Sequence, residues 1–381
     1  MTAMRVGVDG AVYQLATHGG VVRIYDALVP CLSASDPELQ LEIFLDGPHH
    51  STLPCAPRVT ARYCLPFPRY LRPYRLLGRY SAHAHAFAYW AASRRERLDL
   101  WHATYFNYPV RMRGKLVVAN YDMIYWLYPH VFTGPDAQAL RRQQRRALLA
   151  ADHVIAISEA TRADTIRLIG VDPDRISAIP IAHSESYRIL EGSDPLWAPA
   201  VSRLLTEKRE YLLYVGMRGG YKDFRTLVAA LERCRDLDHL LVAVGPPLDA
   251  EELALLSRSG LSERVRVMGG VDDESLAGLY NHAAAFVHTS LYEGFGIPLL
   301  EAMACGCPIA ASRIPSTLEV AADCATYFEP GDPSSAASVI KQVVTAGRAA
   351  ACISDGLTRA ARFTWKRCAR DTLGIYRELV G

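Results

Sequence analysis

Short apolar runs alternate along this chain with longer stretches in which apolar residues recur every three or four positions. The short runs have the length of β-strands, and the longer stretches have the period of amphipathic helices. The expected strands are 4–9, 41–46, 58–64, 98–104, 115–121, 153–158, 175–181, 211–216, 239–244, 264–268, 284–289, 308–312 and 326–329. The expected helices are 20–33, 71–97, 136–150, 159–169, 223–236, 249–259, 273–282, 298–305, 316–322 and 334–346. Such alternation predicts parallel sheets that are covered by helices on both faces.

The alternation lapses at residues 183–209, where glycine and prolines interrupt the pattern. We therefore expect an α/β fold with two doubly wound, Rossmann-like domains, residues 1–190 and 205–362. The amphipathic segment 363–381 is expected to form a helix that crosses back to the first domain. Ligands of open α/β sheets bind beyond the carboxyl ends of the strands. The sequence therefore predicts two domains that face each other across a cleft, with the site in loops that follow strands.

The composition narrows the class of protein. A chain of 381 residues, half of them hydrophobic and 22% charged, suits a globular enzyme with two domains. Its nine cysteines form no regular spacing, which favours a reducing compartment over a disulfide framework. A strand is expected from Met4 onward, which leaves no room for a signal peptide. No apolar run reaches the ~18 residues of a membrane span, so we expect a cytoplasmic protein.

Charge is distributed unevenly in the first half. Between Arg58 and Lys115 there are twelve Lys or Arg residues and two acids, with tyrosines interleaved. Such a segment can meet anionic lipid or a phosphorylated acceptor, which would bring the protein to the inner face of a membrane. A solvated helix face with core aromatics explains it equally well. The chain has no groove-reading motif, so nucleic acid is not an expected partner.

The strongest chemical signal is the run SLYEGFGIPLLEAMA, from Ser290 to Ala304. An expected strand leads into a glycine-bearing loop and then into a helix that the proline of the run can begin. Gly294 and Gly296 allow backbone N–H groups to approach a phosphate, and a helix N-terminus adds partial positive charge. Glu293 and Glu301 can each accept hydrogen bonds from paired hydroxyls of a sugar or ribose. The simpler alternative is a tight turn with a capping glutamate.

This run closely resembles the E-G-F-G-x-P-x-x-E-A-M-A signature of the retaining, GT-B-fold glycosyltransferases of the group-1 family (family four). Residues 214–224 resemble the family's G-x-R-x-x-K-N segment, and residues 269–280 resemble its base-proximal loop and helix. Residues 157–159 and 18–23 are similar to its V-S-E motif and its glycine-rich first loop. The resemblance implies a mannosyltransferase-like enzyme. It would move a hexose from a nucleotide-diphosphate sugar to a glycan or lipid-linked acceptor in cell-surface polysaccharide synthesis.

Arg218 and Lys222 follow the strand that is expected to end at Gly216. The resemblance assigns both cations to the leaving diphosphate, whose negative charge grows in the transition state. The alternative for Arg218 and Lys222 is a surface salt bridge with Asp223 or Glu232.

The resemblance also implies roles for other residues. Beside Arg218 and Lys222 it makes His102 and Glu293 catalytic candidates, with His102 near the transferred sugar, although a lone histidine is more often a packing residue. Asp122 matches the aspartate of the family's H-D pair, but the residue before it is Tyr121. Asp122 is therefore expected to bind acceptor hydroxyls or to cap a turn. The residues implied for donor binding are Gly19, Gly20, Gly216, Val271, Gly294, Phe295, Gly296, Ile297 and Glu301.

No cofactor and no metal are expected. The Asp-x-Asp tripeptides at 172–174 and 236–238 do not lie in a metal-binding context, and Arg218 and Lys222 supply the charge that Mg²⁺ supplies elsewhere. No carboxylate is placed as a nucleophile, so the resemblance implies the family's same-face route to retention. A dehydrogenase is excluded because the first strand is not followed by G-x-G-x-x-G. A nucleotide-sugar epimerase and a non-catalytic homologue of the same fold remain as alternatives.

Overall fold

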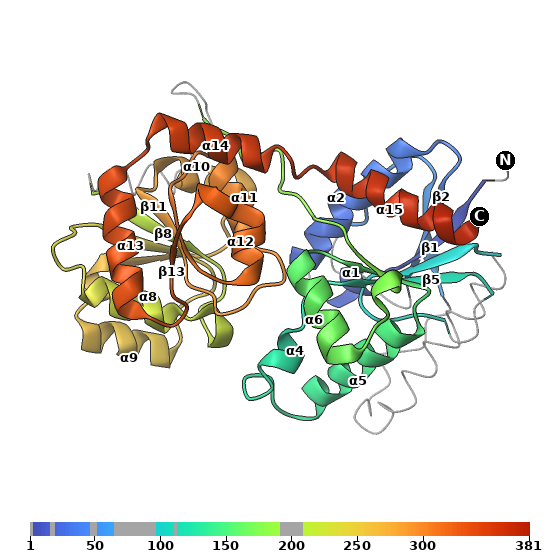
Figure 1. The fold of residues 1–381 in the computed structure, drawn as a ribbon, viewed down its shortest axis with the longest axis horizontal. Coiled ribbons are helices and arrows are strands. Elements are labelled where there is room, and N and C mark those ends of the chain that lie inside the picture. The colour runs from blue at the N-terminus through green and yellow to red at the C-terminus, as the bar shows by residue number, and fades with distance from the viewer. Residues whose placement is uncertain (1–2, 16–19, 46–51, 65–96, 110–112, 191–208) are drawn as a thin grey trace. The chain divides into compact units, whose positions relative to one another are not determined.

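The computed structural model describes residues 3–15, 20–45, 52–64, 97–109, 113–190 and 209–381. It divides the chain into two compact units. Unit 1 comprises the chain up to Ile181 together with Thr364–Gly381, and unit 2 is Ala182–Phe363. Each unit holds one parallel sheet with helices packed against it (Figure 1).

The sheet of unit 1 has the strand order β3-β2-β1-β4-β5-β6-β7. Its strands are β1 (Arg5–Asp9), β2 (Gln40–Leu45), β3 (Val59–Tyr63), β4 (Leu100–Ala103), β5 (Lys115–Asn120), β6 (His153–Ala156) and β7 (Ile176–Ala178). Its helices are α1 (Ala11–Leu15), α2 (Gly20–Ser35), α4 (Ile124–Leu127), α5 (Pro135–Ala150), α6 (Glu159–Ile169) and α15 (Trp365–Val380), with a 3₁₀ turn at Pro173–Arg175.

The sheet of unit 2 has the order β10-β9-β8-β11-β12-β13. Its strands are β8 (Tyr211–Val215), β9 (Leu240–Val244), β10 (Val265–Met268), β11 (Ala285–His288), β12 (Ile309–Ser312) and β13 (Thr326–Phe328). Its helices are α8 (Phe224–Glu232), α9 (Ala250–Ser259), α10 (Asp273–His282), α11 (Ile297–Ala304), α12 (Pro315–Ala321), α13 (Pro333–Ala346) and α14 (Ala350–Ala360). Short 3₁₀ turns lie at Gly220–Lys222, Ser262–Arg264 and Ala322–Cys324.

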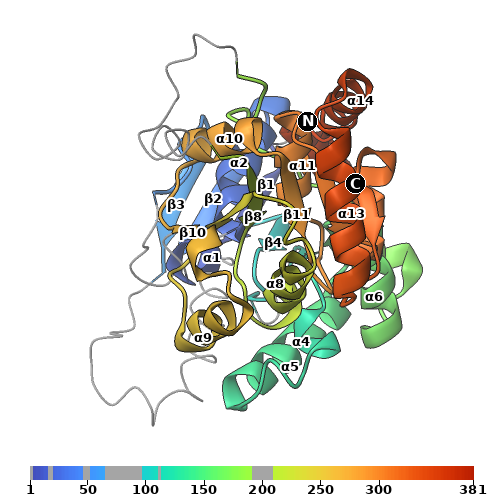
Figure 2. The same cartoon turned by 90° about the vertical axis from the view of Figure 1, so that its left-hand side faces the viewer.

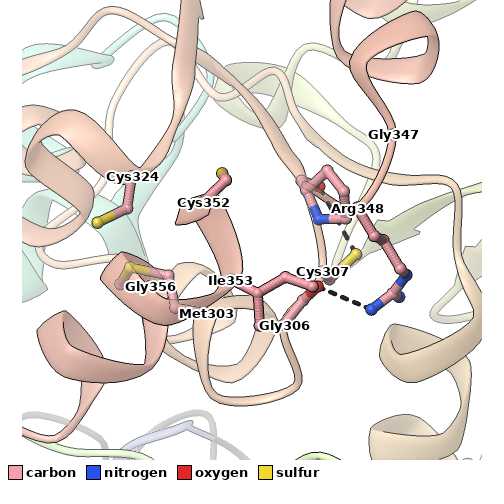
Figure 3. Close-up of a pocket in the computed structure, with 10 residues that line it drawn as sticks. Met303, Gly306, Cys307, Cys324, Gly347, Arg348, Cys352, Ile353 and Gly356 are labelled. Atoms are coloured by element: carbon pink, nitrogen blue, oxygen red, sulfur yellow. Dashed lines mark hydrogen bonds between the residues drawn. The ribbon is translucent and has the colours of Figure 1, made fainter. Parts of the chain in front are cut away.

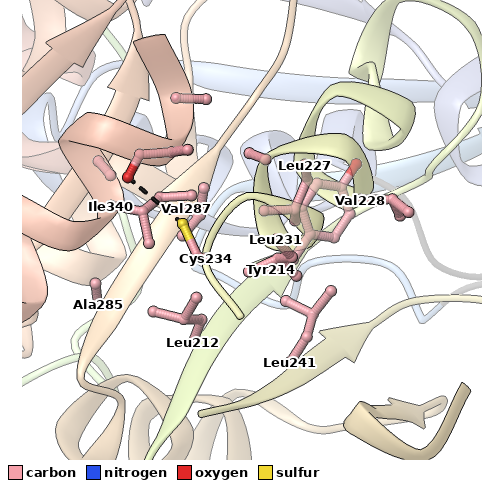
Figure 4. Close-up of a cluster of buried hydrophobic side chains, with 14 of the residues drawn as sticks. Leu212, Tyr214, Leu227, Val228, Leu231, Cys234, Leu241, Ala285, Val287 and Ile340 are labelled. Carbon is pink, nitrogen blue, oxygen red and sulfur yellow. Dashed lines mark hydrogen bonds between the residues drawn. The ribbon is translucent and has the colours of Figure 1, made fainter. Parts of the chain in front are cut away.

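The core of unit 2 follows from the two periods of the sequence. Alternate residues of the strands, such as Leu212 and Val287, meet the apolar stripe of α8 and α13 (Figure 4). Leu227 on α8 and Ile340 on α13 are fully buried in this cluster. Helices α8, α9 and α13 thus cover one face of the sheet, and α10, α11 and α14 pack together on the other (Figure 2). The predicted doubly wound arrangement is confirmed in both units.

The described strands lie within a few residues of their expected positions. The sequence did not predict α1, α4 and α14. Helices of four and five residues, such as α4 and α1, are too short to show a helical period. Helix α14 has no capping side chain at Ala349 and carries Gly356 in its interior, so its usual signals are weak. The helix expected at 71–97 lies almost entirely outside the described residues.

The last segment of the chain forms α15, and this helix packs against α2 in unit 1 (Figure 1). One face of α15 is buried there, comprising Cys368, Ala369, Thr372, Leu373 and Tyr376. Unit 1 is therefore built from two separate parts of the chain, and unit 2 is inserted between them.

Candidate active site

In each sheet the chain reverses its winding direction at one place, between β1 and β4 in unit 1 and between β8 and β11 in unit 2. The loops at such a point leave in opposite directions and open a crevice for a ligand. In unit 2 the loops after β8 and β11 are bonded to each other. Leu291 N donates to Tyr221 O at 2.7 Å, and Thr289 Oγ1 donates to Lys222 O at 2.9 Å. Two motifs that lie about 70 residues apart in sequence thus meet at the ends of adjacent strands.

Glu293 is the centre of a partly buried polar cluster at this point of the sheet. Its Oε1 accepts hydrogen bonds from Lys222 Nζ and from Ser290 Oγ, both at 2.6 Å. His288 Nε2 lies 3.4 Å from the same oxygen. Burial alone would raise the pKa of Glu293, but the Lys222 ammonium and His288 outweigh it and hold that pKa well below its usual range. Glu293 is therefore ionised, and among the described residues no donor contacts its Oε2.

Two of these residues, His288 and Ser290, were not identified from the sequence. His288 is the last residue of β11, and Ser290 begins the loop that follows it. The available signal was their position: polar residues that end a buried strand directly before a glycine-bearing loop. Their side chains contact Glu293 Oε1 and so orient the carboxylate within the protein itself.

The loop continues into α11 much as the sequence predicted. Gly294 is buried, and Gly296 has φ +108° at the N-cap of α11, which begins at Ile297. Phe295 is only 2% exposed and packs edge-to-face on Phe363, with 5.8 Å between ring centroids. Its side chain therefore anchors the loop.

Glu301 lies in the second turn of α11 and is 5% exposed. Its Oε2 accepts a hydrogen bond from the hydroxyl of Tyr280 on α10 at 2.9 Å. Burial, with the Glu301 charge beside it, raises the pKa of Tyr280 well above its usual value, so the phenol stays a donor. The carboxylate of Glu301 is thus oriented by a neutral hydroxyl, whereas that of Glu293 is oriented by a cation.

Arg218 lies elsewhere. Its side chain is 1% exposed and pairs with Glu252, with Nε 3.0 Å from Oε1 and Nη2 3.2 Å from Oε2. The partners considered from the sequence were wrong for Arg218, since Asp223 instead caps α8 by accepting from Thr226 N. Among the described contacts, none joins Arg218 to the Lys222–Glu293 pair.

Three strand ends of unit 2 approach each other through glycines. Gly216 directly follows β8 and has φ +131°, and a Cβ placed on Gly245 would come within 2.4 Å of the carbonyl oxygen of Gly216. Only glycine fits at residue 245, which the sequence reasoning had not singled out. Gly269 follows β10 beside Gly245, and Val271 is half-buried in the same loop. The predicted donor-binding residues Gly216 and Val271 are therefore on neighbouring loops.

In unit 1, His102 ends up inside the core. It is 2% exposed, and its Nδ1 and Nε2 lie 2.6 and 2.8 Å from the hydroxyls of Tyr376 and Tyr25. Burial lowers the pKa of His102 to about 4. The hydroxyl of Tyr121 extends the network to Tyr25, at 2.9 Å. With both ring nitrogens engaged, this geometry favours the packing histidine that the sequence left open as the alternative.

Asp122 caps a turn, since its side chain accepts from Ile124 N at 3.0 Å where α4 begins. Its carboxylate is half-exposed, so this bond does not exhaust what it can do. Gly20 is the exposed first residue of α2. Gly19 lies outside the described residues.

The described part of the chain contains no group of three or more His, Cys, Asp or Glu side chains arranged to hold a metal ion. Within the same residues, no helix has both the length and the apolar character of a membrane-spanning segment. All nine cysteines are free thiols. A small cavity near Cys307 and Arg348 has a volume of about 10 Å³ (Figure 3). That is the lower limit for a single water molecule, so this cavity holds neither sugar nor nucleotide.

Two family models match this chain. Residues 18–182 match the model described as Glycosyltransferase Family 4, and residues 200–355 match the model described as Glycosyl transferases group 1. The chain belongs to the group-1 glycosyltransferases of family four. The resemblance carried by the 290–304 run is confirmed, and the protein is a glycosyltransferase.

Relatives of this glycosyltransferase include the O-antigen chain mannosyltransferase B of Escherichia coli, 27% identical over 286 residues and 74% of each chain. The MMP alpha-(1->4)-mannosyltransferase of Mycolicibacterium hassiacum is 27% identical over 245 residues, 62% of this chain and 56% of its own. Among solved structures, a sucrose-phosphate synthase from Thermosynechococcus elongatus matches with a TM-score of 0.75 and 20% identity over 99% of each chain. Anabaena HepE in complex with UDP-glucose matches with a TM-score of 0.70 and 19% identity over 99% of this chain and 100% of its own. These structures confirm the GT-B fold class.

Proposed function

We propose that this glycosyltransferase moves a hexose, mannose or a similar sugar, from a nucleotide-diphosphate sugar to a glycan or lipid-linked acceptor in cell-surface polysaccharide synthesis. The observation that carries the proposal is the partly buried Lys222–Glu293 pair at the point where the winding of unit 2 reverses. The mannosyltransferase names of the relatives support mannose and a glycan acceptor.

The pair provides two complementary groups within 2.6 Å of each other. The Lys222 ammonium stabilises the negative charge that develops on the leaving diphosphate, and it does so most strongly in the transition state. Glu293 uses Oε1 to hold Lys222, and its Oε2 accepts a hydroxyl of the hexose. The sugar is thereby oriented against the same cation that receives its leaving group.

The remaining predicted residues are assigned to the nucleotide. Backbone groups of Gly294, Gly296 and Ile297 at the start of α11 receive phosphate oxygens, which suits a helix N-terminus. Glu301, oriented by Tyr280, accepts the ribose hydroxyls. The other residues assigned to the donor are Gly19, Gly20, Gly216, Val271 and, through its backbone, Phe295.

Transfer is proposed to retain the configuration at the sugar carbon. The bond from that carbon to the phosphate oxygen breaks, the acceptor oxygen bonds to the carbon from the same face, and the acceptor proton passes to the leaving phosphate. No metal is needed in this scheme because Lys222 supplies the positive charge at the diphosphate.

The acceptor is assigned to unit 1. An open pocket of about 620 Å³ there is lined by Tyr105, Asn107, Leu140 and Gln143 among others. Asn107 Oδ1 accepts from Gln143 Nε2 at 2.7 Å, which orients both amides. An aromatic face beside oriented amides suits a neutral sugar. Asp122, which also belongs to unit 1, would bind acceptor hydroxyls. The basic segment 58–115 would bring the protein to the inner face of a membrane, although residues 65–96 lie outside the described part.

The test is thermal stabilisation by UDP-, GDP-, ADP- and dTDP-sugars in the presence of EDTA, followed by transfer assays with the sugar that binds. A ligand at a hundred times its dissociation constant stabilises by about 2.7 kcal/mol. We expect one nucleotide class to stabilise wild type, and Lys222→Met and Glu293→Gln to lose transfer. Lys341→Met is the matched control, because Lys341 pairs with Asp236 at the surface of unit 2.

Binding without transfer in the presence of a range of acceptors, or release of an epimerised nucleotide sugar, would favour the two alternatives instead. A folded wild-type protein that binds none of the four nucleotide classes refutes the donor site.

A further inference from the structure

Arg218 is a buried cation whose hydrogen bonds all run to one neighbouring segment. Its guanidinium forms two parallel bonds with Glu252 and also donates from Nη2 to the carbonyl oxygens of Pro246, at 2.5 Å, and Pro247, at 2.9 Å. Residues 246–252 form the loop after β9 and the first turn of α9. Arg218 belongs to the loop after β8, so it joins the loops of two adjacent strands.

Glu252 is itself fixed by the start of α9. Its Oε2 accepts from the backbone N of Asp249 at 2.9 Å, and Asp249 Oδ1 accepts from Glu252 N at 2.8 Å. This reciprocal capping box means that Glu252 cannot follow Arg218 without giving up the N-terminus of α9. The carboxylate that neutralises Arg218 is therefore held in place independently of any ligand.

The guanidinium of Arg218 is also packed closely against the backbone at Gly245. A Cβ on Gly245 would lie 3.2 Å from Arg218 Nη1. Among the described residues Nη1 has no hydrogen-bond partner, and its surface is buried. Arg218 is thus packed against the ends of β8 and β9, with 1% of its side chain exposed.

The loop after β8, which carries Arg218, is also bonded to the loop after β11, through Tyr221 O and Lys222 O. Between these two attachments the chain makes the 3₁₀ turn Gly220–Lys222. Lys222 can meet Glu293 at 2.6 Å only while this turn keeps its place. One attachment of the turn depends on Arg218.

We propose that Arg218 is a positioning residue: through Glu252 it fixes the loop after β8 so that Lys222 meets Glu293, and Lys222 alone of the two cations contacts the donor diphosphate. This inference rests on the proposed function, since it assigns roles within the same donor site. It departs from the expectation that both cations bind the diphosphate. A bidentate, capped carboxylate partner makes Arg218 a fixed part of the framework rather than a cation awaiting a ligand.

The experiment compares Arg218→Gln, Glu252→Gln, the double variant and Lys222→Met, each shown to be folded at the assay temperature. For each protein, the affinities for the nucleoside diphosphate that stabilises wild type and for the corresponding monophosphate are measured, with kcat and the donor KM. The ratio of diphosphate to monophosphate affinity reports contact with the second phosphate, and a loss of fold stability alone does not change it.

We expect Arg218→Gln and Glu252→Gln to lower kcat by similar factors, of about 10 to 100-fold, while keeping the wild-type affinity ratio. The kcat of the double variant should be no lower than that of the less active single variant, because both changes break the same connection. Lys222→Met should lower kcat by about 10² to 10³-fold and reduce the affinity ratio about tenfold.

A collapse of the affinity ratio in Arg218→Gln would show direct contact with the diphosphate and overturn the proposal. If Arg218→Gln does not fold, the activity and affinity ratio of Glu252→Gln test the proposal alone, because this variant keeps the guanidinium of Arg218. Unchanged or increased activity in Glu252→Gln means that Arg218 acts directly, and reduced activity with an unchanged ratio supports positioning. Failure of wild type to bind any of the four nucleotide classes refutes the proposed function. A wild type that binds, together with an Arg218→Gln variant that loses the affinity ratio, refutes only this inference.

Discussion

The protonation state of a buried side chain in this protein depends on the hydrogen-bond partners that the protein itself supplies, because burial excludes water. His102 shows this most clearly. It sits between two tyrosine hydroxyls at 2.6 and 2.8 Å, and a neutral imidazole satisfies both because it has one donor and one acceptor nitrogen. An imidazolium would have two donors and a buried charge without a counter-ion. Burial therefore lowers the pKa of His102 to about 4.

This gives a pH dependence of stability whose sign is fixed. The folded-state pKa of His102 lies below the unfolded value of about 6.5, so its contribution is complete above that value and is lost as the pH falls toward 4. Between pH 7 and pH 5 we expect wild type to lose about 2 kcal/mol of stability from this group. The measurement is urea unfolding followed by tryptophan fluorescence, which reports on Trp101 in the adjacent position.

His102→Gln is the control, because glutamine keeps one donor and one acceptor but does not titrate. The pH dependence of wild type should exceed that of the variant by the amount expected for His102, since other groups contribute equally to both proteins. Parallel curves would mean that folding leaves the pKa of His102 at its unfolded value, and would contradict the buried, neutral imidazole of the packing role.

The candidate site was predictable where its chemistry is local in sequence. Glu293 and Lys222 were found because each lies in a motif just after a strand. Their direct pairing was not predicted, and neither was the pairing of Arg218 with Glu252, 34 residues away. A periodic pattern indicates which residues are buried, but not which buried charge meets which, because that depends on how neighbouring loops pack.

At the scale of elements, an arginine that lies outside α11 holds the C-terminal end of this helix. Arg348 precedes α14 and donates to the carbonyl oxygen of Gly306 at 2.7 Å (Figure 3). It also donates to the carbonyl oxygen of Tyr280 at 2.7 Å. These carbonyls lie near the C-terminal ends of α11 and α10, where a cation is favourable. Glu301 and Tyr280 lie on these two helices, so Arg348 holds together the elements that orient the Glu301 carboxylate.

We expect Arg348→Met to destabilise unit 2 by about 2–3 kcal/mol, because several buried carbonyl groups lose a charged donor. For a domain of this size that corresponds to a fall in thermal midpoint of about 5–10 °C, measured by circular dichroism. Arg225→Met is the matched control, since the ion pair of Arg225 with Glu251 is exposed on both sides. Equal midpoints for the two variants would contradict the role of Arg348.

Elements were predicted best where the apolar period runs long enough to be recognised. The buried strands and helices such as α8 and α13 follow the expected ranges closely. Helices α4 and α14 were missed because one spans four residues and the other has weak end signals. Their formation depends on packing against neighbours already in place, and a single sequence does not display that.

At the scale of the whole chain, the division into units is not a division of the sequence into two halves. Unit 2 is one continuous segment, whereas unit 1 needs α15 from the end of the chain. Helix α15 supplies Tyr376 to His102 and packs on α2. Burial of its apolar side chains, Leu373 and Tyr376 above all, is worth roughly 5 kcal/mol, which is comparable with the entire stability of an ordinary domain.

Two fragments should therefore behave differently. Residues 182–363 contain a complete sheet with helices on both faces, so this fragment is expected to unfold in one cooperative thermal transition. Residues 1–181 lack α15 and should show no such transition until a peptide of residues 363–381 is added. A peptide with Leu373→Ala and Tyr376→Ala is the control and should restore far less. If the 1–181 fragment alone melts at the same temperature as its complex with the peptide, then α15 covers a core that is already stable without it, and the contact between His102 and Tyr376 is not needed to form unit 1.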